Sequence, residues 1–111
     1  MLFDTHCHLS DEKFVDDIDA VFENMRQAGV ELAVNVGDGS ADEQPVLELA
    51  GKHPGLYAAT GVHPQDALKF ESDSLDKLRV WLSHPKTVAL GEIGLDYYYD
   101  NAPHEVQLDV F

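Results

Sequence analysis

The sequence predicts an α/β fold of the (β/α)8-barrel (TIM-barrel) type, with about the first four βα units present in its 111 residues. The first observation behind this is that apolar runs of strand length alternate with stretches of helical periodicity. Such alternation favours a parallel sheet with right-handed crossovers. The second observation is that the apolar runs begin near residues 2, 30, 56 and 87. This spacing suits one βα unit of a barrel, which needs about 250 residues in all.

The first half of the chain contains the first two expected βα units. A strand over residues 2–9 ends in polar residues, and helical spacing continues over 11–28 until Gly29 supplies the stop. The next strand covers residues 30–36, where every position but two is apolar. The helical positions that carry the apolar face are Ile18, Val21, Phe22 and Met25.

The second helix is expected after the break at residues 37–39. Ser40 and Glu43 resemble a capping box ahead of an apolar stretch. Pro45 conflicts with a helix that starts at Ser40, because the second helical turn needs a backbone N–H that proline lacks. A start nearer Asp42 removes this conflict.

The second half continues the same alternation. Strands are expected over residues 56–62 and 87–90, with a helix over 73–82 between them. Pro103 opens a further helix that is still running at the end of the sequence. Residues 1–111 are therefore expected to be the N-terminal part of one longer barrel domain. A small doubly wound sheet of four strands is the alternative.

Composition limits the setting in which this protein works. No apolar run approaches the roughly 20 residues of a membrane span, and the N-terminus does not resemble a secretory signal. The single cysteine, Cys7, fits a reducing, cytoplasmic environment. Seven Lys and Arg face 21 Asp and Glu, a net charge of −14 that argues against gripping nucleic acid with a basic face. Bound divalent cations can nevertheless meet a phosphate, so a phosphoester enzyme is not excluded.

Three of the four expected strands end in unusual polar residues. The clusters are His6-Cys7-His8, Gly61-Val62-His63-Pro64 and residues 91–96, Gly-Glu-Ile-Gly-Leu-Asp. Sites in parallel βα folds form at the C-terminal ends of strands. The sequence therefore predicts one functional site that all three clusters share.

His6 and His8 are candidate metal ligands. Residues two apart on a strand point to the same face, so both imidazoles can reach one ion. Asp4 lies on that face too and can orient a ligand histidine. The alternative is a pair of ordinary buried histidines. Cys7 points to the opposite face and is expected to pack in the core.

Glu92 is the candidate catalytic carboxylate. It follows an apolar strand, where an unpaired buried charge is unfavourable, and cations bridged by it would stabilise it. The alternative is an ion-paired surface glutamate. Asp96 can hold the following loop, hold a ligand or start a turn.

His63 can hydrogen-bond a substrate phosphate, or be an ordinary loop histidine. The run Tyr97-Tyr98-Tyr99 offers either a surface on which a base stacks or a packed lid. The other histidines, His53, His84 and His104, are expected to be structural or exposed.

The three motifs closely resemble the signatures of the TatD-type metal-dependent deoxyribonucleases, within the wider amidohydrolase-like group. The resemblance rests on Asp4–Leu9, Gly61–Pro64 and Gly91–Tyr98, in the family's order, and extends over the whole chain. It implies a (β/α)8 barrel that hydrolyses DNA phosphodiester bonds, often from the 3′ end. It also implies two divalent cations, of Mg, Mn or Zn.

The resemblance assigns a role to each candidate residue. His6 and His8 would bind one cation, Glu92 would bridge both, and His63 would lie near the substrate phosphate. The family's further ligands, two histidines and an aspartate on later strands, would lie beyond Phe111.

The departure from the family's length leaves three expectations. The 111-residue chain alone is not expected to be an efficient nuclease, and the C-terminal half of the barrel is needed to complete the site. A hydrolase of amide or ester bonds is a second interpretation, because fold does not choose the substrate. A non-catalytic fragment that requires a partner chain is a third.

Overall fold

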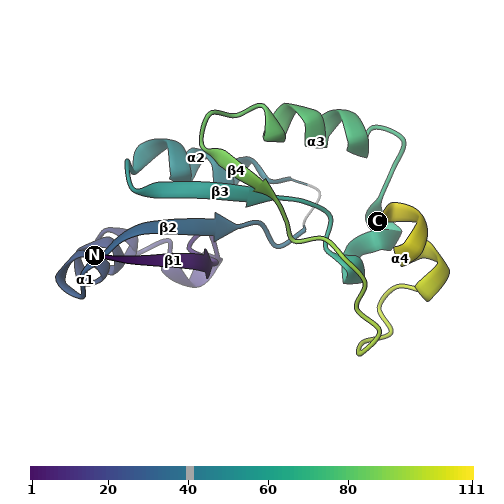
Figure 1. Ribbon diagram of the computed structural model, residues 1–111, viewed down its shortest axis with the longest axis horizontal. Helices are drawn as coiled ribbons and strands as arrows, with labels where there is room; N and C mark the ends of the chain where they lie inside the picture. Colours follow the sequence, from purple (N-terminus) through teal and green to yellow (C-terminus); the bar gives the residue numbers. More distant parts are fainter. Residues whose placement is uncertain (40–41) are drawn as a thin grey trace.

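Four parallel strands form the centre of the molecule. The computed structural model describes residues 1–39 and 42–111. The strands are β1 (Leu2–Cys7), β2 (Val30–Val36), β3 (Leu56–Thr60) and β4 (Thr87–Leu90), and they hydrogen-bond in the order β1-β2-β3-β4 (Figure 1). All three neighbouring pairs are parallel. Each strand is therefore added beside the one before it.

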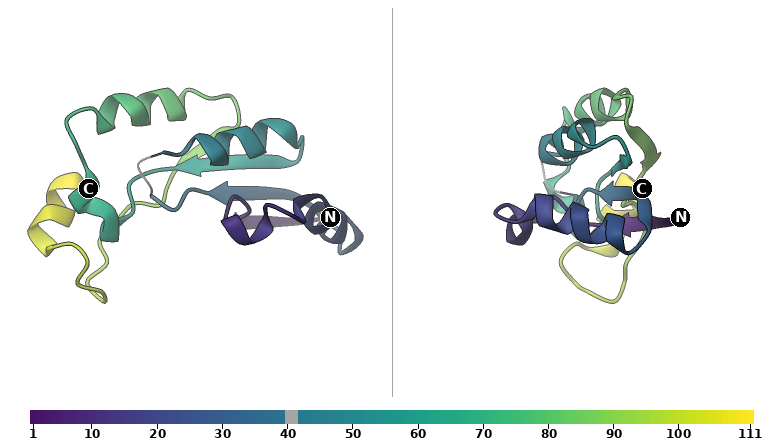
Figure 2. Two further views of the ribbon diagram at one scale, coloured as in Figure 1. Left: turned by 180° about the vertical axis from the view of Figure 1, so that it is seen from behind. Right: turned by 90° about the vertical axis from the view of Figure 1, so that its left-hand side faces the viewer.

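The connections distinguish a barrel from a doubly wound sheet. The crossover helices are α1 (Ile18–Gln27), α2 (Gln44–Lys52) and α3 (Ser74–Leu82). The end-on view in Figure 2 shows them along one side of a curved sheet, with the strands inside the arc. A doubly wound sheet reverses its strand order and carries helices on both faces. The strand order and the one-sided helices are those of the first four βα units of a barrel, as the sequence predicts.

The main core lies between the sheet and the first two helices. Strands β2 and β3 are buried between neighbours, whereas the edge strands β1 and β4 expose apolar side chains such as Phe3 and Val88. The buried cluster consists of Leu9, Ala33, Val46, Leu47, Ala50, Leu56 and Ala58. Small residues on the central strands allow the helices to pack closely against the sheet.

The expected helix over residues 11–28 is divided in two. Asp11 Oδ1 accepts the backbone N–H of Lys13, and a short 3-10 helix, η1 (Glu12–Phe14), forms there. The α-helix begins only at Ile18. The single helix was therefore wrong, because a local side-chain cap closes a separate turn. Gly29 ends α1 with a φ of 79°, as predicted, since a positive φ favours glycine.

Helix α2 begins two residues after Asp42, close to the expected start. The Asp42 carboxylate accepts the backbone N–H of Gln44 at 2.9 Å, and Pro45 lies in the first turn, where it does not disturb the helix. Ser40 lies outside the described residues, and with it the expected capping box. The Glu43 side chain is fully buried and accepts the Gly39 N–H at 3.2 Å.

The remaining boundaries follow the predictions with three differences. Strands β1 and β3 each end two residues earlier than expected, and a 3-10 helix, η2 (Pro64–Lys69), follows β3 without having been predicted. His63 caps η2, because its Nδ1 accepts the N–H of Gln65 at 3.1 Å. The last helix, α4 (His104–Val110), begins directly after Pro103.

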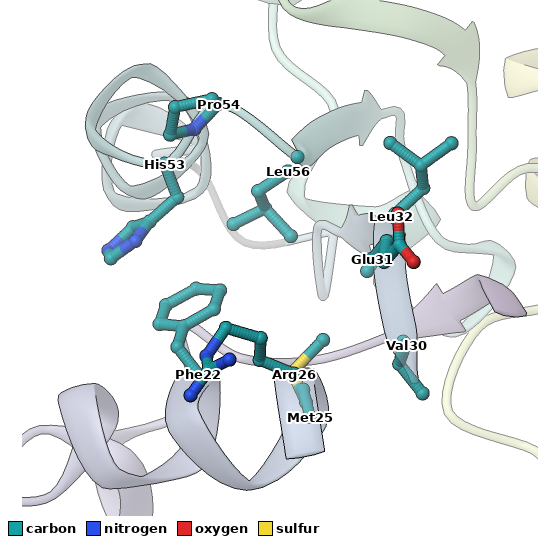
Figure 3. A pocket seen from close by; sticks show the side chains of 11 residues that line it. Phe22, Met25, Arg26, Val30, Glu31, Leu32, His53, Pro54 and Leu56 are labelled. Atoms are coloured by element: carbon teal, nitrogen blue, oxygen red, sulfur yellow. The ribbon is translucent and has the colours of Figure 1, made fainter. Parts of the chain in front are cut away.

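At the N-terminal end of the sheet, the polar side chains are engaged in hydrogen bonds or ring stacking within the chain. Lys86 Nζ donates to the carbonyl oxygens of His53, Pro54 and Leu56 at 2.7–3.2 Å. The His53 ring stacks on Phe22 with 3.7 Å between ring centroids. These rings line a small pocket of about 260 Å³ between α1, β2 and the turn that leads from α2 into β3 (Figure 3). His53 is thus structural, as expected.

None of the helices within residues 1–39 and 42–111 has the length and apolar character needed to cross a membrane.

Candidate metal centre

Three side chains from two distant segments meet at the C-terminal ends of the strands. Nε2 of His6 lies 3.1 Å from Nε2 of His8. Oε2 of Glu92 lies 3.5 Å from the first nitrogen and 3.8 Å from the second. The sequence placed these residues at one edge of the sheet, and the structure brings their ligand atoms together within 4.8 Å.

The orientation of His8 is fixed by the neighbouring strand. Its Nδ1 lies 2.9 Å from the carbonyl oxygen of Val36, the last residue of β2. A carbonyl oxygen can only accept, so Nδ1 must carry the proton. In the neutral ring, Nε2 then has a free lone pair that points toward His6 and Glu92. This is the tautomer that a metal-ligating histidine needs.

Asp4 does not have the role that the sequence suggested. Its Oδ1 accepts the backbone N–H of His6 at 3.0 Å, and so it braces the strand rather than an imidazole. The β1–β2 register shifts between Asp4 and Cys7. Because of this shift, the rule that side chains two residues apart share one face of a strand does not extend from Asp4 to His6 and His8.

Cys7 packs against the core, as predicted. Its Sγ donates to the carbonyl oxygen of Val34 at 3.2 Å. Burial, followed by the nearby negative charge of Asp4, raises the pKa of the Cys7 thiol to about 11. The thiol is therefore protonated at neutral pH, which fits the packing role expected for Cys7.

Sequence reasoning missed Asn35. Its side chain is fully buried, accepts the N–H of Leu9 at 2.7 Å and donates to Ser10 Oγ at 3.3 Å. These bonds hold the turn that follows His8 against β2. The available signal was a lone amide within the apolar run of β2, because buried polar groups are normally hydrogen-bonded.

Glu92 sits against the end of β3. A Cβ added to Gly61 would lie 2.7 Å from the Glu92 carbonyl oxygen, so only glycine allows the two segments to approach this closely. The Gly91–Glu92 peptide bond is cis. The Glu92 side chain is 36% exposed rather than buried. Its apolar neighbours Leu90 and Ile93 do not cover it, because they are themselves exposed.

His63 reaches the same centre from the segment between β3 and η2. Its Nε2 lies 4.0 Å from Oε1 of Glu92, the oxygen that does not face His6 and His8. Because its Nδ1 accepts the Gln65 N–H, the neutral ring carries its proton on Nε2. His63 and His8 therefore present opposite groups to the centre, a donor and a lone pair.

The loop after β2 packs against the backbone of His63. A Cβ on Gly39 would lie 2.5 Å from the His63 Cβ, so the loop and the histidine backbone are in close contact. Glu43 lies beneath this loop, and a Cβ on Gly37 would collide with its carboxylate. Burial, together with the charges of Asp38 and Asp42, raises the pKa of Glu43 to about 7, against a smaller opposing effect of the Gly39 N–H.

Asp96 holds the tyrosine-rich loop, one of the three roles considered for it. Its Oδ1 accepts the N–H of Tyr98 at 2.9 Å. Gln65 and Gln107, both missed by sequence reasoning, bind the backbone of the same residue. His104, expected to lie at the surface, is exposed and stacks on Tyr97 with 3.8 Å between centroids.

The three ligand atoms are spaced as a divalent metal requires. Nitrogen and oxygen ligands bind such ions at about 2.0–2.2 Å, so two ligands of one ion lie no more than about 4.4 Å apart. The distances of 3.1, 3.5 and 3.8 Å all meet this condition. Two neutral imidazoles and a carboxylate are also a common donor set for divalent transition metals. The residues present therefore fit a metal ion.

The fold and site together define the class: a barrel-type α/β chain that gathers imidazole and carboxylate ligands at the C-terminal ends of its strands. Comparison with known families matches residues 3–111 to the family described as TatD related DNase. The chain belongs to this family, in agreement with the resemblance of its motifs.

Individual relatives support this assignment. The chain is 38% identical, over its whole length, to YabD of Bacillus subtilis (strain 168), named an uncharacterized metal-dependent hydrolase. It is 32% identical, over 99% of its length, to a protein of Erwinia tasmaniensis named 3′-5′ ssDNA/RNA exonuclease TatD. The crystal structure of YjjV, a TatD homologue from Escherichia coli K12, superposes with a TM-score of 0.88 at 36% identity over 98% of the chain.

The chain spans less than half the length of these relatives. It covers 44% of YabD, 43% of the Erwinia protein and 43% of the YjjV chain.

Proposed function

We propose that this chain is the N-terminal part, residues 1–111, of a metal-dependent deoxyribonuclease that hydrolyses phosphodiester bonds from the 3′ end of DNA. The observation that carries the proposal is the convergence of His6 Nε2, His8 Nε2 and Glu92 Oε2 within 4.8 Å. Family membership and the exonuclease name of the Erwinia relative support the choice of substrate.

His6, His8 and Glu92 would hold the cations. The two imidazole nitrogens and Oε2 of Glu92 lie together and would bind one ion, and Glu92, whose Oε1 lies on the side of His63, would also contribute to a second. Cations held there would supply stabilisation of negative charge on the phosphoryl group and activation of water for attack. Glu92 is the catalytic carboxylate, because its two oxygens face the two sides of the centre.

His63 binds the substrate phosphate. Its proton on Nε2 makes it a hydrogen-bond donor toward the centre, and a phosphate oxygen can only accept. The Gln65 N–H and the contact with Gly39 keep the ring in this orientation. The net charge of −14 does not oppose this role, because the cations and His63 meet the phosphate locally.

The C-terminal half of the barrel completes the site. Strands β1 and β4 are the edges of the described sheet and expose apolar side chains, which supports a covering by further strands and helices. The chain covers 43–44% of the length of these relatives, and the remainder of each relative is long enough to supply such strands and helices.

The test uses the protein at its native length, which intact mass spectrometry of the purified protein establishes. Single-stranded DNA labelled at either end is incubated with Mg²⁺, Mn²⁺ or Zn²⁺, with and without chelator. We expect metal-dependent loss of 3′ nucleotides. Hydrolysis of amide or ester substrates with intact DNA would contradict the proposal.

Site variants identify the residues responsible. His6→Ala combined with His8→Ala is expected to abolish chelator-sensitive cleavage and to lower bound metal in elemental analysis. His84→Ala is the matched control, because His84 lies after α3 at the opposite end of the sheet and its Nδ1 accepts the Lys86 N–H. Full activity and metal content in the double variant would overturn the assignment.

A further inference from the structure

We propose that Tyr97–Tyr99 form a stacking platform that binds a nucleobase of single-stranded nucleic acid beside the phosphate site. The platform lies in the loop between β4 and α4, which projects beyond the C-terminal ends of the strands (Figure 1). The inference rests on the proposed nuclease function and adds a binding subsite to it.

The tyrosine rings are unusually open to solvent. Tyr97, Tyr98 and Tyr99 are 47%, 83% and 57% exposed. The rings of Tyr98 and Tyr99 meet edge to face with 4.7 Å between centroids, which leaves ring faces free. Tyr97 is already stacked on His104 and anchors the start of the run. A packed lid would instead bury its aromatic faces against the chain.

The loop is tied directly to the segment that carries His63. The Gln65 side chain donates from Nε2 to the carbonyl oxygen of Asp96 at 2.8 Å, and its Oε1 accepts the N–H of Asn101 at 3.1 Å. One amide therefore clamps both ends of the tyrosine run. Gln65 lies two residues after His63, so the backbone of the tyrosine loop is held against the segment that carries the proposed phosphate-binding histidine.

A second amide clamps the same loop from α4. The buried Gln107 accepts the Asp96 N–H at 2.9 Å and donates to the carbonyl oxygens of Asp96 and Ala102, both at 3.0 Å. Two glutamines thus fix the backbone while the rings stay exposed. A rigid aromatic surface of this kind binds with little loss of conformational entropy.

The charge of the segment favours a base over a phosphate as the ligand. Residues 91–111 contain no lysine or arginine, and Asp96 and Asp100 flank the tyrosines. Such a loop does not attract the sugar–phosphate backbone. Stacking needs only the π-face that every base offers, so it suits an enzyme that processes many sequences.

The experiment compares steady-state kinetics of Tyr98→Ala and Tyr98→Phe in the native-length protein on single-stranded DNA. Loss of one stacked base corresponds to an increase in KM of about tenfold. We expect this increase for Tyr98→Ala, with kcat changed less than twofold, and near-normal KM for Tyr98→Phe. Phe111→Ala, which removes an exposed ring outside the loop, is expected to leave both constants unchanged.

A substrate change provides the matching test. An oligonucleotide with abasic residues at its 3′ end is expected to raise KM for the wild type and to remove the difference from Tyr98→Ala. Equal KM values for wild type and Tyr98→Ala on normal DNA would overturn the platform, and a decrease in KM would indicate a lid.

The two proposals fail in distinguishable ways. If the wild type does not cleave DNA, the nuclease proposal fails, and fluorescence anisotropy of labelled single-stranded DNA then tests the platform alone. Weaker binding by Tyr98→Ala than by wild type and Phe111→Ala would support it, and equal binding by all three would overturn it.

Discussion

The two ends of the sheet use the same residue types for opposite purposes. At the N-terminal end, the Lys86 ammonium donates hydrogen bonds to three carbonyl oxygens. The His53 ring there stacks on Phe22 (Figure 3). At the C-terminal end, His6 and His8 direct their Nε2 atoms toward Glu92 and remain about half exposed. The polar side chains at the N-terminal end are thus engaged in structural contacts, whereas the imidazoles at the C-terminal end remain accessible to a ligand. In barrel folds the first arrangement serves stability and the second serves function.

The histidines make this difference concrete. His53 and His84 precede prolines, and each is engaged by a neighbour at the base of the sheet. His8 is anchored to the neighbouring strand through Nδ1, and its Nε2 faces His6 and Glu92 at the candidate centre. Residue type alone therefore does not distinguish a structural histidine from a metal ligand. The surroundings of the second nitrogen do, because Nε2 of His8 faces His6 and Glu92.

Glu92→Gln is expected to produce the largest effect at the C-terminal end. Changes in groups that merely orient metal ligands cost about 10- to 100-fold in activity, so removing the carboxylate should cost at least a hundredfold. The melting temperature in the presence of chelator is expected to stay unchanged, because Glu92 is partly exposed and closes no core contact. Activity assays and thermal melts measure the two properties, and retained activity would contradict the role of Glu92.

Lys86→Met is expected to lower stability while leaving activity unchanged, the opposite of the result expected for Glu92→Gln. Three carbonyl oxygens lose a charged donor, which should lower the free energy of unfolding by about 2–3 kcal/mol. Metal content and activity per folded molecule should stay normal. Urea unfolding measures the loss, with Lys69→Met, which removes an exposed pair with Asp66, as the control. Equal stability of the two variants would mean that the hydrogen bonds of Lys86 do not stabilise the N-terminal end of the sheet.

Glu43 adds a pH dependence to the functional end. A carboxyl whose pKa is raised from 4.5 to about 7 prefers its proton in the folded state. Its contribution to stability is therefore lost as pH rises through that range, by roughly 3 kcal/mol at most. Glu43→Gln should unfold at a higher temperature than wild type at pH 8 but not at pH 5. The exposed Glu48→Gln provides the control, and the same difference at both pH values would exclude the mechanism.

Cys7 lies between the two proposed metal-binding histidines in the sequence and is expected to show the smallest effect. With a pKa of about 11, its thiolate is scarce at pH 8, and alkylation by iodoacetamide should be much slower than for glutathione. Unfolding in urea should restore the normal rate. Mass spectrometry over time measures both rates, and fast alkylation of the folded protein would show that the thiol is not held in the core.

Local patterns were sufficient for most of the secondary structure. Strands β2 and β4 have the predicted bounds, and Gly29 ends α1 at the expected place. Apolar periodicity and glycine punctuation act over a few residues, so they can be read directly along the chain. The helix over 11–28 was wrong because a side-chain cap at Asp11 competes at the same short range.

The alternation of elements and the three polar motifs at strand ends were determined by the sequence alone, and with them the barrel class and the family. Only the tertiary structure decided which atoms meet: the proton position on His8, the pairing of Asp4 with a backbone N–H, the burial of Glu43, and the two glutamine clamps on the tyrosine loop. Apart from the local bond of Asp4, these contacts join separate elements of the fold. Register and side-chain satisfaction are properties of the packed chain, and no local pattern encodes them.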